Sequence, residues 1–214
     1  NGNTSGSITI EAPAVAGTNT ITLPASSGTL LDSTSTLDAT KLTGDLPAIS
    51  GANLTGLPGI NSGTAVASTS GTSIDFTGIP SGTKRITVML SGVSTNGTSN
   101  IECRIGSGSI ETAGYNGSGM YSISGASPNV GISSTGFKID NWASAASIRS
   151  GILTLHLTDT NDWVFSAVTS TSNSASVGSG SGSKTISGTL DRLRITTVNG
   201  TDTFDAGSIN ILYE

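Results

Sequence analysis

Charged residues are scarce in this sequence: Lys, Arg, Asp and Glu together make up 11% of its 214 residues. Globular proteins usually contain about 25% charged residues, and disordered acidic segments contain more. The formal net charge of −5 is mild, and the nine Lys and Arg residues are scattered along the chain. Because nucleic-acid binding needs a clustered basic face, we expect no nucleic-acid partner.

Cysteine and histidine are almost absent, with one residue of each, Cys103 and His156. A single cysteine excludes an internal disulfide framework. Cys103 alternates with Ile101 and Ile105 and is therefore predicted to be a buried, unpaired residue on a strand. One His with no Cys or acidic partner makes a poor metal site, so we expect neither a metal site nor a cofactor.

Aromatic residues are missing from the first 60 residues. A unit of about 60 residues is already marginal by surface-to-volume scaling, so we do not expect this one to fold alone. Its segment KLTGDLPAISGANLTGLPG (41–59) nevertheless repeats Leu-Thr-Gly at Leu42 and Leu54. We interpret residues 1–61 as an extended, β-rich shaft that trimerises by sharing leucines around a threefold axis. These leucines are Leu42, Leu46, Leu54 and Leu57. A flexible Gly/Ser/Thr linker is the alternative.

Alternating apolar and polar residues dominate the rest of the chain, from 62 to 214. The pattern is clearest in KRITVMLSGV, SNIECRIGS, SGILTLHLTD, DWVFSAVTS and GSINILYE. Asn-Gly pairs at 96, 116 and 199 indicate tight turns, the first of them a hairpin. GSGSGSK (178–184) is typical of a flexible surface loop. About eight short strands with polar turns predict an all-β fold, a jelly-roll-like antiparallel β-sandwich preceded by the shaft.

Two regions resemble proteins of tailed bacteriophages. LDATKLTGDLPAISGANLTGLPG resembles segments that recur in tail fibres. SGTKRITVMLSGVSTNGTSNIECRIGSGSIETAGY and SGTLDRLRITTVNGTDTFDAGSINILYE are similar to the C-terminal domain of many tail fibre proteins. The resemblance implies a virion component, commonly trimeric, whose terminal domain faces the host cell. It carries no functional site with it, because the matching residues are structural in kind.

Catalytic chemistry finds little support in the sequence. A glycoside hydrolase needs two carboxylates in one cleft, about 5–10 Å apart. The Asp residues at 159, 162, 191, 202 and 205 fall instead in turn-like contexts, where Asp is common. DTNDW (159–163) lacks the spaced ligands, the Gly and the closing Glu of a calcium loop. We therefore expect no enzyme activity and no metal.

The few aromatic residues are the best candidates for binding a sugar. Trp163 and Phe165 fit a strand of the sandwich core. The other candidates follow or flank predicted turns, and loops on a rigid scaffold often carry binding groups. The predicted receptor-binding residues are Trp142, Tyr115 and Tyr121, with the amides of Asn141, Asn116 and Asn129.

These observations lead to one functional hypothesis and two alternatives. The hypothesis is a tail fibre or tail-tip adhesin that attaches the virion to the host cell surface without catalysis. Its expected partners are two further copies in a homotrimer, other tail or capsid proteins, and a host surface polysaccharide or outer-membrane protein. The main alternative is a structural or decoration fibre of the capsid or neck without a dedicated receptor. An enzyme that degrades surface polysaccharide is the third. Because the chain starts at Asn1 without Met, we expect it to be a piece of a longer protein.

Overall fold

The computed structural model describes residues 59–214. Residues 1–58 of the predicted shaft lie outside the described range, and so do Leu42, Leu46, Leu54 and Leu57. Their packing around a threefold axis stays a prediction. The first described strand, β1, begins at Asn61 and pairs with the C-terminal strand β14.

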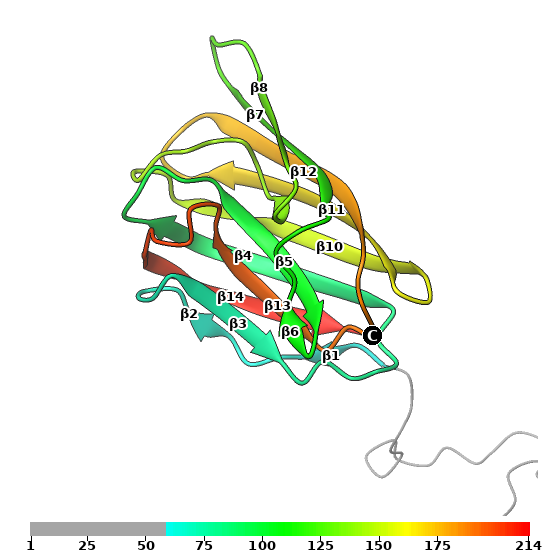
Figure 1. Ribbon diagram of the computed structural model, residues 1–214. Helices are drawn as coiled ribbons and strands as arrows, with labels where there is room; N and C mark the ends of the chain where they lie inside the picture. Colours follow the sequence, from blue (N-terminus) through cyan, green and yellow to red (C-terminus); the bar gives the residue numbers. More distant parts are fainter. Residues whose placement is uncertain (1–58) are drawn as a thin grey trace, which may run out of the picture. The chain divides into compact units, whose positions relative to one another are not determined.

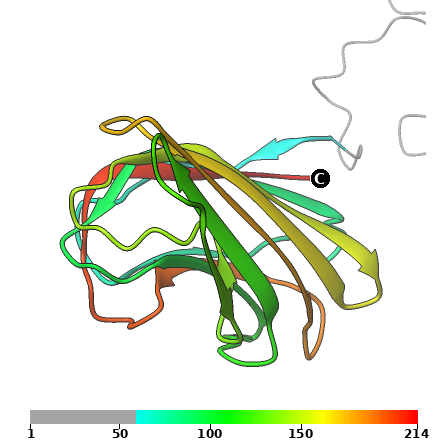
Figure 2. The ribbon, with the colours of Figure 1, turned by 90° about the horizontal axis from the view of Figure 1, so that it is seen from above.

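The described residues form two antiparallel β-sheets that enclose one core (Figures 1 and 2), and they contain no helix. The predicted all-β sandwich is confirmed, with more strands than expected. In spatial order the nine-stranded sheet contains β1 (Asn61–Ser62), β14 (Phe204–Tyr213), β4 (Arg85–Thr95), β10 (Arg149–Asp159), β11 (Asp162–Thr171), β12 (Ser176–Thr185), β7 (Asn116–Ile123) and β8 (Asn129–Ser133), with β2 (Val66–Ala67) beside β14. The five-stranded sheet contains β3 (Ser73–Thr77), β13 (Arg192–Thr197), β5 (Ile101–Ser107) and β6 (Ser109–Ile110), with β9 (Phe137–Lys138) beside β5.

The buried core is built from the apolar residues that the sequence places at every second position of the strands. Ile86, Val88 and Leu90 of β4 are all buried. Leu153 and Leu155 of β10 lie opposite Val88 and Ile86 in the register and are fully buried. Burying an aliphatic side chain of this size contributes about 1.5–3 kcal/mol, so the inward-facing rows account for much of the driving force for folding.

Two of the three Asn-Gly pairs mark turns, but neither turn closes a hairpin. Asn96-Gly97 connects β4 to β5, and the pair at 199–200 connects β13 to β14, so both connections pass from one sheet to the other. Hydrogen bonds join the two connections: the Thr203 amide donates to Asn96 Oδ1 at 2.9 Å, and the Ser99 amide donates to Asp202 Oδ2 at 2.8 Å. A side chain on Gly97 would overlap the Asp202 carboxylate. The glycine is needed here for close approach, and the hairpin prediction was wrong.

The segment 178–184, predicted to be a flexible loop, is instead part of strand β12 in the larger sheet. Its glycines face inward, where the chain from 136 to 141 lies directly on the sheet. A Cβ on Gly178 would come within 2.5 Å of the Asp140 Cβ, and one on Gly180 would overlap the Lys138 carbonyl oxygen. Glycines of β7 and β8 continue the same surface. This glycine bed consists of Gly117, Gly119, Gly131, Gly178, Gly180 and Gly182.

The third Asn-Gly pair, Asn116-Gly117, begins strand β7 and is paired with β12, so the turn predicted there is absent. Strand β7 continues into β8, and this hairpin projects beyond the body of the sandwich at the top of Figure 1. The chain then returns inward as β9, which crosses the glycine bed. The aromatic residues predicted to bind lie around this return.

Candidate functional site

Tyr115 belongs to the core and not to an exposed loop. Its side chain is buried, and its ring meets Phe137 edge-on with centroids 4.9 Å apart. The hydroxyl accepts a hydrogen bond from the Ile105 amide at 2.8 Å and lies 3.0 Å from the Ile105 carbonyl oxygen. The predicted exposure of Tyr115 was wrong because the Asn-Gly pair after it starts a strand. Trp163 and Phe165, predicted to lie in the core, are both buried.

Tyr121 and Trp142 form an aromatic stack between β7 and the loop before β10. Their ring centroids are 4.3 Å apart and their planes differ by 18°. Tyr121 is buried on the inner side of β7, which corrects its predicted loop position. Trp142 lies outside the strands, as predicted, and is half-buried. The stack therefore presents an indole to solvent with a buried phenol ring supporting it.

Side-chain amides lie beside the stack. Asn141 donates from Nδ2 to Asn129 Oδ1 at 3.0 Å, and its Oδ1 accepts a hydrogen bond from Lys138 Nζ at 2.8 Å. Asn129 is exposed on β8, directly opposite Tyr121 in the register. The structure thus brings together four of the six predicted residues. We call the set Tyr121, Asn129, Lys138, Asn141 and Trp142 the aromatic–amide cluster.

Asn116 does not belong to this cluster. It is exposed at the start of β7, five residues from Tyr121. At about 3.4 Å per residue along a strand, five residues correspond to roughly 17 Å. Asn116 and Tyr115 instead border a separate depression beside the first residues of β7.

An internal ion pair holds the loop that carries Trp142. Arg149 Nε donates to Asp140 Oδ2 at 2.9 Å, and both side chains are 1% exposed. The Trp142 amide donates to Asp140 Oδ1 at 3.0 Å, and Arg149 Nη2 donates to the Trp142 carbonyl oxygen. Sequence reasoning missed this pair. The available signal was that Asp140 and Arg149 are charged residues close to Trp142 in a chain with very few charges.

Lys138 is the one basic member of the cluster, and it is buried. Burial lowers the pKa of its ammonium group below the usual range, while the negative charges of Glu102 and Asp140 act in the opposite direction. The Lys138 ammonium also donates to Asn141, so its position depends on an amide as well as on charge. The cluster therefore combines an aromatic face with amides and one partly desolvated cation.

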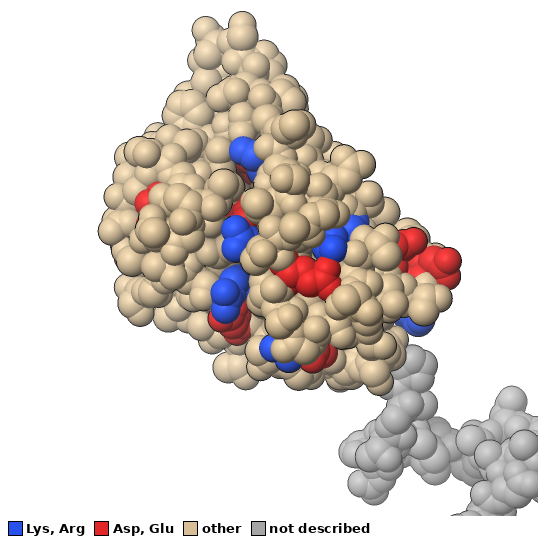
Figure 3. Space-filling model, in the orientation of Figure 1, with Lys and Arg blue, Asp and Glu red and all other residues tan. Residues whose placement is uncertain are grey.

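The carboxylates of residues 59–214 are all engaged within the fold. Figure 3 shows acidic and basic atoms lying next to one another on the face it displays. Each carboxylate accepts a hydrogen bond or forms an ion pair. The partners are Arg194 for Asp75, Arg104 for Glu102, Lys184 for Glu111, Arg149 for Asp140, the Thr160 amide for Asp159, Thr185 for Asp162, Arg192 for Asp191, the Ser99 amide for Asp202, Ser94 for Asp205 and Arg85 for Glu214.

Within the described part of the chain there is no group of three His, Cys, Asp or Glu side chains placed to hold a metal ion. The same residues contain no helix of the length and apolarity that a membrane crossing requires. No family model, curated protein or solved structure matches this chain. The tail fibre resemblance therefore depends on the sequence segments quoted above.

Proposed function

We propose that this chain is part of a bacteriophage tail fibre or tail tip that attaches the virion to the host by binding a surface polysaccharide. The observation that carries the proposal is the half-buried Trp142 stacked on Tyr121, with Asn141 and Asn129 beside it. The resemblance of the two sequence regions to tail fibre proteins supplies the viral setting.

The chemistry of the cluster suits an uncharged sugar. A pyranose presents an apolar C–H face, which packs on an indole, and several hydroxyl groups, which pair with amides. Tyr121 fixes the indole from behind, so little side-chain entropy is lost when a sugar packs on it. If three copies assemble as expected, avidity strengthens a weak single contact by about 100-fold or more.

The proposed attachment is non-catalytic. Hydrolysis of a glycosidic bond needs one protonated and one ionised carboxyl group on either side of the bond. The carboxylate nearest to Trp142 in the chain, Asp140, is buried and paired with Arg149. Its role in the fold is to hold the loop, which argues against a role as acid or nucleophile.

A structural fibre without a receptor is the second candidate. It is favoured by the outer face of the larger sheet, where exposed Ile152 and Val168 suit contact with protein better than contact with a sugar. The two candidates differ in what Trp142 does: only the adhesin needs its indole at the surface.

A cell-adsorption assay tests the proposal. The full-length chain, fluorescently labelled, is incubated with a panel of bacterial strains, and the susceptible strain is then stripped of surface polysaccharide or treated with protease. We expect adsorption to be lost with the polysaccharide and to fall at least tenfold in Trp142→Ala, while Val198→Ala, an exposed control elsewhere, adsorbs normally. Adsorption lost only after protease treatment would indicate an outer-membrane protein receptor. Adsorption to no strain would favour the structural fibre.

A further inference from the structure

The outer face of the larger sheet, which points away from the core, is apolar and hydroxyl-rich. Six of the ten large aliphatic side chains that are exposed in residues 59–214 lie on it. They belong to the neighbouring strands β10, β11 and β12 and to β8, which is separated from β12 by β7. These residues are Val130, Ile132, Ile152, Val164, Val168 and Val177.

The register shows that the face is continuous. Ile152 of β10 lies opposite Met89 of β4 on one side and Val168 of β11 on the other. The same row continues across β12 and β7 through Ser179 and Met120 to β8. One band of side chains therefore crosses six strands without a charge.

Hydroxyl groups fill the adjacent row and pair with one another. Thr154 and Ser166 lie opposite each other on β10 and β11, with their hydroxyl oxygens 2.7 Å apart. The hydroxyls of Ser118 and Ser181 are 3.5 Å apart on β7 and β12. Because Thr154 and Ser166 already bond to each other, covering this pair removes fewer hydrogen bonds to water.

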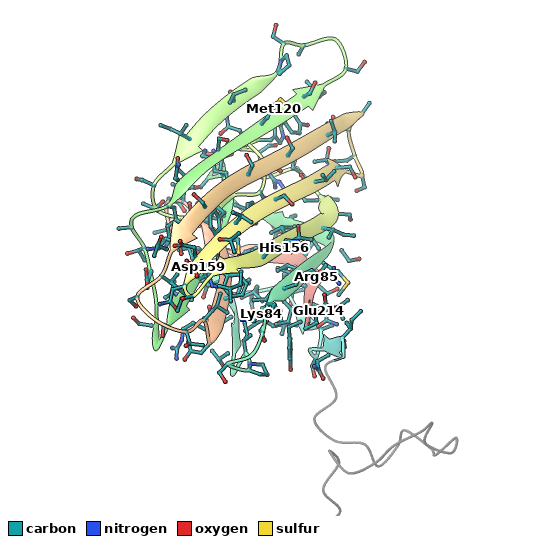
Figure 4. All side chains as sticks on the ribbon, turned by 90° about the vertical axis from the view of Figure 1, so that its right-hand side faces the viewer. Lys84, Arg85, Met120, His156, Asp159 and Glu214 are labelled. Carbon is teal, nitrogen blue, oxygen red and sulfur yellow. The ribbon has the colours of Figure 1, made fainter. Side chains whose placement is uncertain are left out.

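Charged side chains lie only along one margin of this face. In Figure 4, Met120 lies in the upper part of the sheet, and the labelled Lys84, Arg85, His156, Asp159 and Glu214 all lie below it. Arg85 and Glu214 form an ion pair there, 2.7 Å apart. A partner recognised by charge would find no complementary group across the main part of the face.

We propose that this outer face packs against the outer face of another copy of this chain. Two identical faces that meet are related by a twofold axis, so the second copy comes from outside the trimer expected around the threefold axis of the shaft. An uncharged surface suits its own copy, because no like charges are brought together by symmetry. The face spans roughly 24 Å across six strands and roughly 20 Å along them, at about 4.8 Å per strand and 3.4 Å per residue. Two such faces cover about 1,000 Å², which reaches the lower limit for a specific interface.

The association leaves the aromatic–amide cluster free. Tyr121 lies on the inner side of β7 and Met120 on the outer side, because successive strand residues point to opposite faces. The proposal therefore does not depend on sugar binding and applies equally to a structural fibre.

Cysteine crosslinking of the full-length chain tests the interface. Val168 lies near the middle of the face, so Val168→Cys brings two introduced thiols together across a symmetry axis. Val198→Cys is the control, since Val198 is exposed in the β13–β14 connection, away from the face. The native Cys103 is fully buried and contributes no label. A short bismaleimide is added at micromolar protein concentration, and crosslinked dimer is quantified on a denaturing gel.

We expect at least fivefold more crosslinked dimer from Val168→Cys than from Val198→Cys. Adding Ile152→Glu to the Val168→Cys chain places a carboxylate on the face and should reduce the yield to the control level. Circular dichroism confirms that each variant is folded. A Val168→Cys yield no higher than that of the control would overturn the proposal. A yield that Ile152→Glu leaves unchanged would also overturn it.

Discussion

The guanidinium of Arg149 and the carboxylate of Asp140 meet inside the sandwich, with 2.9 Å between Nε and Oδ2 and with both side chains 1% exposed. The pair joins the start of β10 to the chain that leaves β9, nine residues earlier. The loop between these two residues contains Trp142, whose amide and carbonyl groups both bond to the pair. The half-buried indole thus depends on a buried salt bridge for its position.

Removing one partner of this pair should destabilise the fold. In Arg149→Met the Asp140 carboxylate stays buried without its counter-ion, and we expect the free energy of unfolding to fall by about 3–5 kcal/mol. Adding Asp140→Asn removes the uncompensated charge and should restore part of the loss. Urea unfolding of the single and double variants measures both effects. A loss below about 1 kcal/mol in Arg149→Met would contradict the buried arrangement.

The two rings of the aromatic stack should differ in their effect on stability. Tyr121 is buried, so Tyr121→Ala leaves a cavity and should lower stability by about 3–5 kcal/mol. Trp142 is only half-buried, so Trp142→Ala should cost less than Tyr121→Ala, about 0.5–3 kcal/mol. Within residues 59–214 the Tyr121 hydroxyl has no hydrogen-bond partner, so Tyr121→Phe should leave stability nearly unchanged. Thermal and denaturant unfolding of the three variants ranks their losses of stability. A larger loss in Trp142→Ala than in Tyr121→Ala would contradict this arrangement of the two rings.

The glycine bed offers a matched pair of substitutions on one strand. Gly180 faces inward beneath the Lys138 carbonyl, whereas the next residue, Ser181, is exposed. Gly180→Ala forces the backbone from 138 to 140 away from the sheet and should destabilise by about 1–3 kcal/mol or more. Ser181→Ala should change stability by less than about 0.5 kcal/mol. If the two substitutions changed the unfolding midpoint equally, the chain from 136 to 141 would not lie directly on the glycines of β12.

Much of the sandwich could be predicted from the sequence, because a strand with one face in the core repeats apolar residues at every second position. Ile86, Val88 and Leu90 carried that signal, and so did Trp163 and Phe165 in the core. The glycine-rich strand could not be recognised, since its inward positions are filled by backbone from another segment and show no apolar pattern. The residues around a glycine do not show which distant segment of the chain packs against it.

The site could be predicted only in part, for a similar reason. Trp142 was recognised by the polar residues before it, and the structure leaves it half-buried in a loop. Tyr115 and Tyr121 were misplaced because an Asn-Gly pair was interpreted as a turn, whereas Asn116 begins a strand whose partner is β12. The pairing partner of a strand is set by the whole sheet, which a short motif does not encode.

The thiol of Cys103 should react very slowly in the folded protein and should show little response to pH. Its side chain is fully buried, burial raises the pKa of the thiol above the usual range, and the negative charge of Glu102 raises it further. Since only the thiolate reacts, raising the pH from 7 to 9 should leave labelling by a maleimide slow. An ordinary exposed thiol, with a pKa of about 8.5, would accelerate more than tenfold over this interval. Such an acceleration without denaturant would show that β5 is exposed.

The central claim, that a sugar packs on Trp142, is tested most directly by tryptophan fluorescence. The chain contains two tryptophans, Trp142 and Trp163. Within residues 59–214 the indole N–H of the buried Trp163 has no hydrogen-bond partner, so Trp163→Phe breaks no hydrogen bond. The substitution leaves Trp142 as the only fluorescent tryptophan. This variant is titrated with polysaccharide released from a strain to which the protein adsorbs. We predict a saturable blue shift of the emission, with the same midpoint as adsorption. An emission spectrum that stays unchanged at saturating polysaccharide, while the protein still adsorbs, would contradict the claim.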